Sequence, residues 1–262
     1  MKRLLLPALL LTTLTACTAA PAGTLPAAAP TPTPASTPAP TAAPAPADAL
    51  TQEEKIGQLF IIRPDALDLT LPQETINDAK ADGVTMLTDA MRETLQAYPV
   101  GGICQFGKNI TDPEQLAQFN ADLQAASRTP LFIAVDEEGG AVARLANHPA
   151  FDLPQYESAA AVGASGDPAD ACAMGQTIGA YLKEYGFNMD FAPDADVNTN
   201  PDNPIIGTRA FSPDAADAAD CAAAMARGLA GEGILPTFKH FPGHGDTAED
   251  SHTGLAYSYR TV

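Results

Sequence analysis

The feature that most constrains the fold is a regular alternation between short apolar segments and segments of helical character. We expect strands over four apolar segments, each short enough and continuous enough to be buried: 100–106, 131–135, 187–192 and 234–238. We expect helices at 88–97, 112–127, 169–185 and 214–232. Another helix begins with a capping box, Thr51 and Glu54, and leads into the apolar segment 56–62. This alternation predicts a parallel sheet covered by helices.

Two folds fit such a pattern, a barrel and an open doubly wound sheet. An open sheet usually binds a nucleotide through a glycine-rich turn, and the Gly-Gly pairs here match neither of the usual nucleotide-binding motifs. Ionisable residues directly follow several strands, at 136–138, 194–196 and 239–240. Strands that deliver polar groups to one rim are typical of a (β/α)8 TIM-type barrel. We therefore predict an α/β barrel, incomplete here, with about five of its eight strands.

The segment 239–252, at the end of the last predicted strand, is rich in ionisable residues. It holds three of the four histidines, one lysine and several acidic residues. Pro242, Gly243 and Gly245 prevent a regular helix or a central strand there. An irregular, ionisable loop after a buried strand is typical of an active-site rim. His148 lies in another loop and receives no role.

The spacing of His240 and His244 suggests a metal pair as an alternative. On a helix the two imidazoles would share one face and could bind zinc. Phe241-Pro242-Gly243 breaks the helix that this geometry needs. We therefore predict no metal and no other cofactor, and we expect His244 to brace the loop through hydrogen bonds.

Five sequence blocks, taken in order, resemble bacterial β-N-acetylglucosaminidases of glycoside hydrolase family 3. The resemblance covers essentially all of 50–262. The blocks are Val100-Gly101-Gly102-Ile103, Asp136-Glu137-Glu138-Gly139-Gly140, Asp190-Phe191-Ala192-Pro193, Ile206-Gly207-Thr208-Arg209-Ala210-Phe211, and Lys239-His240-Phe241-Pro242-Gly243-His244-Gly245 with Asp250-Ser251-His252. Where the family usually has an arginine after the Gly-Gly pair, this chain has Ala141.

The resemblance assigns roles to seven residues. It implies that a terminal N-acetylglucosamine is bound by Asp136, Arg144, Arg209, Lys239 and His240. It also implies that His252 is the acid/base and that Asp250 supports it. Glu137 and Glu138 are interpreted as structural.

The chemistry of such a pair can be argued from its side chains. Retaining cleavage of a glycosidic bond needs a proton donor for the leaving oxygen and a carboxylate nucleophile on the other side. A histidine can give and then take a proton near neutral pH, and an aspartate can orient it. Asp250 and His252 can share a side only in an extended or turned segment. A solvated polar turn is the structural alternative for these residues.

In the family, the nucleophile is an aspartate in a segment well downstream of the histidine-rich loop. No segment of residues 1–262 matches it. We expect it beyond Val262, and we expect the 262-residue chain alone to be inactive. The predicted function is retaining removal of terminal β-linked N-acetylglucosamine from oligosaccharides such as peptidoglycan or chitin fragments. A non-catalytic sugar-binding lipoprotein, a family 3 β-glucosidase and a phosphorylase are the alternatives.

The N-terminal segments predict export and a lipid anchor. Residues 1–17 combine a basic start, a short apolar run and Leu14-Thr15-Ala16-Cys17, which resembles a lipobox with Cys17 as the lipidation site. Residues 18–49 are a Pro/Ala/Thr-rich linker, and 50–262 form the predicted barrel domain. We therefore expect an extracytoplasmic protein, either secreted or bound to a membrane through this anchor alone.

The net charge of −18 excludes nucleic acid and anionic membrane surfaces as ligands. The other cysteines, Cys104, Cys172 and Cys221, are widely spaced among apolar residues. They are interpreted as small buried side chains, with one disulfide left open as an alternative.

Overall fold

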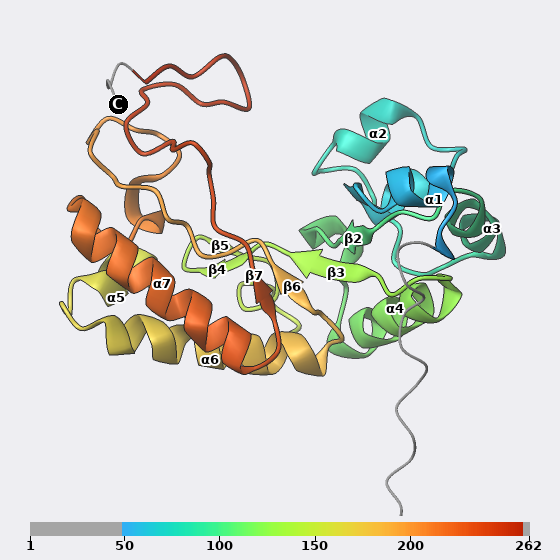
Figure 1. Ribbon diagram of the computed structural model, residues 1–262, viewed down its shortest axis with the longest axis horizontal. Coiled ribbons are helices and arrows are strands. Elements are labelled where there is room, and N and C mark those ends of the chain that lie inside the picture. Colours follow the sequence, from blue (N-terminus) through green and yellow to red (C-terminus); the bar gives the residue numbers. More distant parts are fainter. Residues whose placement is uncertain (1–48, 259–262) are drawn as a thin grey trace, which may run out of the picture. The chain divides into compact units, whose positions relative to one another are not determined.

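A computed structural model describes residues 49–258 of the 262. Five strands form one parallel sheet in the order β1-β2-β3-β6-β7 (Figure 1). Their bounds are β1 (Ile61–Ile62), β2 (Gly102–Cys104), β3 (Phe132–Val135), β6 (Met189–Asp190) and β7 (Leu235–Pro236). The predicted α/β class and the five strands are confirmed. Within 49–258 the barrel is not closed, because β1 and β7 each pair with one strand only.

The predicted helices are present with nearly the expected bounds: α1 (Gln52–Gly57), α3 (Asp89–Ala97), α4 (Pro113–Ala126), α6 (Pro168–Glu184) and α7 (Ala215–Gly231). The capping box of Thr51 and Glu54 is confirmed at the start of α1. Asp112 caps α4, whose first residue is Pro113. These caps satisfy backbone N–H groups that have no partner inside the helix.

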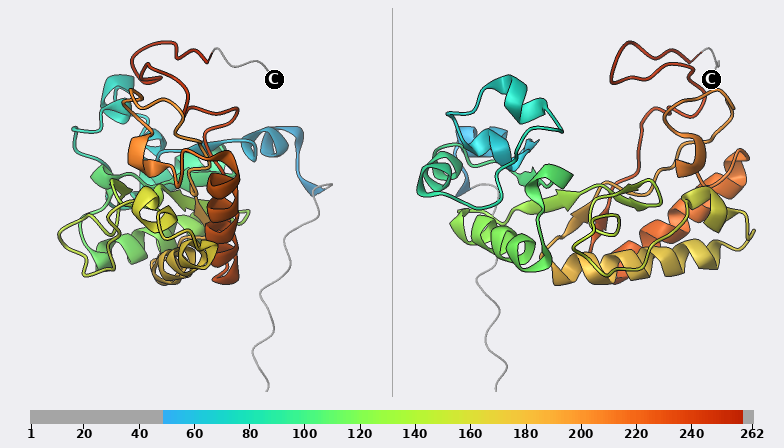
Figure 2. Two further views of the ribbon diagram at one scale, coloured as in Figure 1. Left: turned by 90° about the vertical axis from the view of Figure 1, so that its left-hand side faces the viewer. Right: turned by 180° about the vertical axis from the view of Figure 1, so that it is seen from behind.

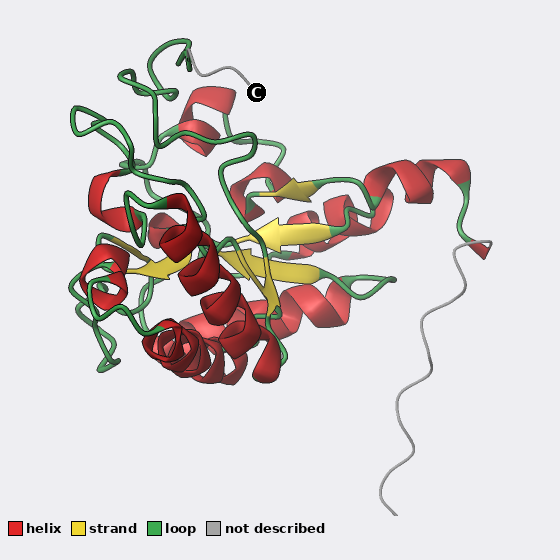
Figure 3. Cartoon of the chain, turned by 60° about the vertical axis from the view of Figure 1, so that its left-hand side comes forward, coloured by secondary structure: helices red, strands yellow, loops and turns green. Residues whose placement is uncertain are grey.

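Several short elements are not anticipated by the sequence pattern. They are α2 (Gln73–Asn77), α5 (Ala159–Gly163), the 3-10 segments η2 (Pro64–Leu67), η3 (Gly107–Asn109) and η4 (Gly207–Arg209), and an antiparallel hairpin of β4 (Glu137–Gly139) and β5 (Val142–Ala143). The strands are also shorter than the apolar segments that predicted them. Figure 3 shows the short strands with loops at their ends, and backbone hydrogen bonds continue past several strands, as from Gln105 N–H to the oxygen of Ala134 and from Thr237 N–H to that of Ala192, each at 2.8 Å.

The two faces of the sheet bury different sets of residues. Ile103, Ile133 and Val135 point into the main core, which the helices cover. Cys104 and Ala134, the intervening residues, belong to a separate small cluster on the opposite face. Because side chains alternate along a strand, each strand contributes to both faces.

The cysteines of the described region are free, and Cys104 and Cys221 are buried while Cys172 is half-buried. The disulfide alternative for these three residues is therefore wrong. No helix within 49–258 is both long and apolar enough to span a bilayer. The predicted signal peptide, Cys17 and all but the last residue of the predicted linker lie outside the described residues.

Helices α6 and α7 pack side by side through small residues (Figure 2). A β-carbon added to Gly175 in α6 would lie 2.2 Å from the carbonyl oxygen of Met225. One added to Gly228 in α7 would lie 2.2 Å from the carbonyl oxygen of Cys172. Backbone approaches that close leave no room for any side chain, so these glycines set the distance between the helices.

We expect Gly175→Ala to destabilise the protein even though alanine favours a helix by about 1 kcal/mol over glycine. Forcing the two helices apart should cost about 1–3 kcal/mol beyond that gain. Gly231→Ala is the matched control, because no atom lies within 4 Å of the added carbon in the last residue of α7. Urea unfolding should show a loss for the first variant and none for the control. Equal stability of both variants would contradict this packing argument.

Candidate active site

The ionisable residues meet at the carboxyl ends of the strands. Asp136 directly follows β3, and Lys239 follows β7 after a two-residue extension. A parallel bridge between Asp194 and Lys239 continues the pairing of β6 with β7 beyond the two strands. The β4–β5 hairpin turns back over this rim and carries Arg144 directly after β5. Residues far apart in sequence are therefore brought to one place by strand register.

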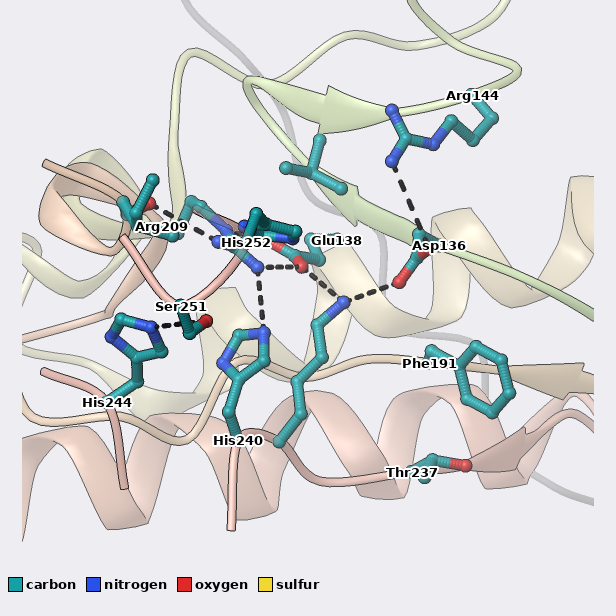
Figure 4. Close-up of a pocket in the computed structure, with 13 residues that line it drawn as sticks. Asp136, Glu138, Arg144, Phe191, Arg209, Thr237, His240, His244, Ser251 and His252 are labelled. Carbon is teal, nitrogen blue, oxygen red and sulfur yellow. Dashed lines mark hydrogen bonds and ion pairs between the residues drawn. The ribbon is translucent and has the colours of Figure 1, made fainter. Parts of the chain in front are cut away.

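A pocket of about 420 Å³ lies at this rim. Six of the seven residues assigned from the sequence line it: Asp136, Arg144, Arg209, Lys239, His240 and His252. The seventh, Asp250, contacts His252. The remaining lining residues are Glu138, Val142, Phe191, Ile205, Thr237, His244 and Ser251. The pocket thus combines ionised groups with a few apolar side chains (Figure 4).

An ion network of Asp136, Glu138, Arg209 and Lys239 lines the pocket, and Arg144 makes a longer ion pair with it. Lys239 Nζ donates to Asp136 Oδ1 at 2.7 Å and also contacts Glu138 Oε1. Arg209 binds Glu138 with two parallel hydrogen bonds, Nε to Oε2 at 2.8 Å and Nη2 to Oε1 at 2.7 Å. Arg144 Nη2 lies 3.9 Å from Asp136 Oδ2. The paired geometry fixes the guanidinium plane of Arg209.

The carboxylates outweigh burial in setting the pKa values of the cations. Burial alone would favour the neutral forms of Lys239 and Arg209. The charges of Glu138 and Asp136 reverse that effect and raise the pKa of Lys239, and hydrogen bonding to Glu138 likewise raises that of Arg209. Both side chains therefore stay charged at neutral pH.

His240 is oriented by a hydrogen bond to a buried carboxylate. Its Nδ1 lies 2.6 Å from Asp196 Oδ2, and its Nε2 lies 3.1 Å from Arg209 Nη2. Arginine can only donate, so Nε2 accepts and Nδ1 carries the proton that is donated to Asp196. Burial opposes the charge of Asp196, but hydrogen bonds from His240 and from the backbone N–H of His244 hold the pKa of its carboxyl below the usual value.

The acid/base pair assigned from the sequence lies on the outer loop. His252 donates its backbone N–H to Asp250 Oδ1 at 2.8 Å, and its Nδ1 lies 2.7 Å from the same oxygen. The backbone and side-chain hydrogen bonds from His252 lower the pKa of Asp250. The side chain of His252 is 77% exposed, against 29% for Asp250. The turn around Ser251 brings the two residues to one side, as the sequence requires.

Sequence reasoning missed Glu138, Asp194 and Asp196. Glu138 was interpreted as structural, yet it lines the pocket and binds both Arg209 and Lys239. The sequence does contain one indication of this role. Glu138 lies two residues after Asp136, so in an extended segment the two side chains lie on the same side. The sequence indicates a role for Asp196 more weakly, because its position after a predicted strand is the only feature that distinguishes it.

Glu137 contacts the interior, away from the pocket. Its carboxylate accepts the N–H groups of Leu145 and Ala146, each at 2.9 Å, and the hydroxyl of Tyr181 at 2.9 Å. These bonds tie the end of the β4–β5 hairpin to the core next to Arg144. Burial nevertheless raises the pKa of Glu137.

Within residues 49–258, one group of side chains has the donor atoms for a cation. Ligand atoms of Asp194, Asp196 and His240 all lie within 4.8 Å of one another. Both oxygens of Asp196 already accept hydrogen bonds, one from His240 and one from His244. An ion would have to replace the proton shared by His240 and Asp196, so the arrangement fits a hydrogen-bonded pair better than a metal centre.

The parallel sheet, the strand-end rim and the ionised pocket are the features of an α/β barrel-type enzyme domain. Residues 51–261 match the glycosyl hydrolase family 3 N-terminal domain. The chain therefore belongs to glycosyl hydrolase family 3.

Similar proteins carry related names. Beta-hexosaminidase A of Pseudoalteromonas piscicida is 37% identical over 177 residues, which cover 66% of this chain and 30% of that protein. A glycoside hydrolase family 3 beta-N-acetylglucosaminidase from Paenibacillus sp. superposes with a TM-score of 0.65 and 37% identity, covering 79% and 36% of the two chains. NagZ from Neisseria gonorrhoeae, in complex with N-trifluoroacetyl-D-glucosamine, gives a TM-score of 0.62 at 31% identity, covering 68% and 53%. The chain thus spans about a third to a half of the length of these relatives.

A buried carboxyl beneath the site leads to a prediction about pH. Burial, and next the charge of Asp196, raise the pKa of Asp194 from 3.8 to about 7. Between these pH values the folded protein holds a proton that the unfolded chain releases. The proton on Asp194 therefore stabilises the folded protein fully below pH 4. This contribution to the free energy of unfolding is lost as the pH rises through 7, at up to about 1.4 kcal/mol per pH unit.

Asp194→Asn should remove this contribution, because an amide cannot ionise while its oxygen can still accept the N–H of Asp196. The free energy of unfolding, measured in urea from pH 4 to pH 8, should fall less steeply for the variant than for the unchanged protein. Asp152→Asn, at an exposed loop position, is the control. Parallel pH profiles for Asp194→Asn and the unchanged protein would refute the assignment.

Proposed function

We propose that this domain removes terminal β-linked N-acetylglucosamine from oligosaccharides such as peptidoglycan or chitin fragments, with retention of configuration. One observation carries the proposal: the ion network of Asp136, Glu138, Arg209 and Lys239 and the Asp250–His252 pair belong to the same pocket. Membership of the family supports the reaction type. The names of the similar proteins support the N-acetylated sugar.

The pocket suits a single sugar ring. Sugar hydroxyls both donate and accept hydrogen bonds, and this rim alternates carboxylate acceptors with Lys239, Arg144 and Arg209 as donors. Because these charged groups already hold one another in place, little reorganisation is needed when a ring binds. Phe191 and Val142 offer apolar surface to the C–H groups of the ring. The volume of about 420 Å³ is at the small end for ligand pockets.

His252 is the proposed acid/base. Its exposed imidazole can reach the oxygen of a leaving group that extends toward solvent, and Asp250 fixes Nδ1 so that Nε2 faces the reaction. The negative charge of Asp250 stabilises the imidazolium form that gives the proton. A carboxylate nucleophile outside residues 1–262 is part of the proposal, as is a covalent glycosyl-enzyme.

We further infer that the domain works outside the cytoplasm, tethered by lipid at Cys17 through the linker 18–49. The lipobox-like Leu14-Thr15-Ala16-Cys17 supports this placement. Oligosaccharides of the cell envelope would then be within reach of the domain.

We expect His252→Ala in the full-length protein to lower kcat/KM by about 10²–10⁴-fold on an alkyl N-acetyl-β-glucosaminide, because the alkoxide leaving group needs a proton. A dinitrophenyl glycoside needs no such help and should be affected far less. Steady-state kinetics on the two substrates measures the difference. Equal losses on both would remove His252 from the acid/base role. Sugar binding without any turnover by the unchanged protein would favour the non-catalytic alternative.

Arg144→Ala should mainly weaken binding of the sugar, because Arg144 is the pocket cation least engaged by carboxylates. We expect KM, and the dissociation constant for N-acetylglucosamine, to rise by about tenfold, the value of one charge-assisted hydrogen bond. Arg128→Ala is the matched control, since Arg128 pairs with Glu54 at the surface. Isothermal titration should separate the two variants. An unchanged affinity in Arg144→Ala would place this arginine outside the sugar site.

A further inference from the structure

The loop that carries Asp250 and His252 is fastened to the domain by His244. This residue is largely buried and its backbone N–H donates to Asp196 Oδ1 at 2.5 Å. Its Nε2 lies 2.9 Å from Ser251 Oγ, and its Nδ1 lies 2.8 Å from Thr247 Oγ1. Figure 4 shows the contact between His244 and Ser251 beside the pocket. His244 thus joins buried Asp196 to the outer loop, because its backbone binds Asp196 while its imidazole binds Ser251.

The imidazole of His244 has a hydrogen-bond partner at each ring nitrogen, Thr247 Oγ1 at Nδ1 and Ser251 Oγ at Nε2. The carbonyl oxygen of His244 accepts Asn203 Nδ2 at 2.7 Å, the backbone N–H of Thr247 at 3.2 Å and the hydroxyl of Thr247 at 3.0 Å. These bonds hold both the backbone and the ring of His244 in place, so the ring is a fixed partner for Ser251.

Ser251 stands between the two members of the acid/base pair. The side chains of Asp250 and His252 bond to each other, and both are more exposed than that of His244. A pair held only by mutual contact on an irregular loop would have many orientations relative to the sugar. The bond from the buried imidazole to Ser251 restricts the turn at its centre.

We propose that His244 is a positioning residue for the acid/base: through the hydrogen bond between its Nε2 and Ser251 Oγ, it holds the turn 250–252 in place over the pocket. The inference rests on the proposed function, because it takes His252 as the acid/base. His244 does not touch the reacting atoms in this scheme. Its effect reaches the reaction through Ser251, and a displacement of about 1 Å in a catalytic group can cost about 10²-fold in rate.

The test uses leaving-group dependence in the full-length protein. Ser251→Ala removes the hydroxyl that bonds to His244 at an exposed position, so folding should be unaffected, and unchanged thermal unfolding checks this. We expect kcat/KM for an alkyl N-acetyl-β-glucosaminide to fall at least tenfold and that for the dinitrophenyl glycoside to change less than about threefold. Ser251→Thr keeps the hydroxyl and should restore most of the loss. If Ser251 had a merely structural role, its loss would lower kcat/KM for both substrates alike.

A double-mutant cycle tests the route through Ser251. His244→Gln should show the same preference for the activated substrate, and combining it with Ser251→Ala should add little beyond the larger single effect. Additive losses, or equal losses on both substrates, would overturn the inference. So would an unaltered Ser251→Ala enzyme in a protein whose His252→Ala variant shows the leaving-group effect. If His252→Ala itself shows none, the proposed function fails, and this inference fails with it.

Discussion

The ion network at the strand ends is the interaction on which the site depends. Glu138 lies between Arg209 and Lys239, and Lys239 in turn holds Asp136. These four residues come from the end of β3, the β4–β5 hairpin, η4 and the segment after β7. The side chains of Glu138, Arg209 and Lys239 are largely shielded from solvent, so each charge needs the others as partners. Loss of any member would leave an uncompensated charge at the rim.

The layer beneath this network explains how so many carboxyl groups can be buried together. Asp190 and Asp194 are 0% and 2% exposed and lie next to the pocket residues in sequence or in space. Burial raises the pKa of Asp190 well above its usual value, and it does the same for Asp194. A protonated carboxyl carries no charge, so protonation of these two groups removes the repulsion that they would exert on the carboxylates of the network.

The sequence anticipated those parts of the fold that follow from local patterns. Helices were predicted where a capping residue such as Asp112 precedes a suitable segment, and strands where a short segment is continuously apolar. The alternation of helices and strands then predicts the parallel sheet. The assigned residues of the rim were found because they directly follow strands or belong to compact motifs.

The missed parts depend on contacts between distant residues. The segment 64–87 shows no period, and its course is held by Lys108, which donates to the carbonyl oxygens of Thr75, Ile76 and Asp78. No local pattern encodes such bonds. The β4–β5 hairpin is similar, because buried Glu137 holds it through backbone N–H groups. Glu138 was misjudged since its partners, Arg209 and Lys239, are 71 and 101 residues away in sequence.

The site combines two kinds of anchoring that suit the two tasks of the proposed function. Recognition of a ring needs fixed donors and acceptors, and the strand-end residues provide them through ion pairs such as that of Arg209 with Glu138. Proton transfer to a departing group needs a residue near solvent, and the proposed acid/base, His252, is exposed and lies on a loop. A residue on a loop is accessible to solvent, but its orientation is less fixed than that of a residue at a strand end. His244 bridges this difference, because its backbone binds Asp196, the buried partner of His240, while its imidazole binds the turn that carries His252.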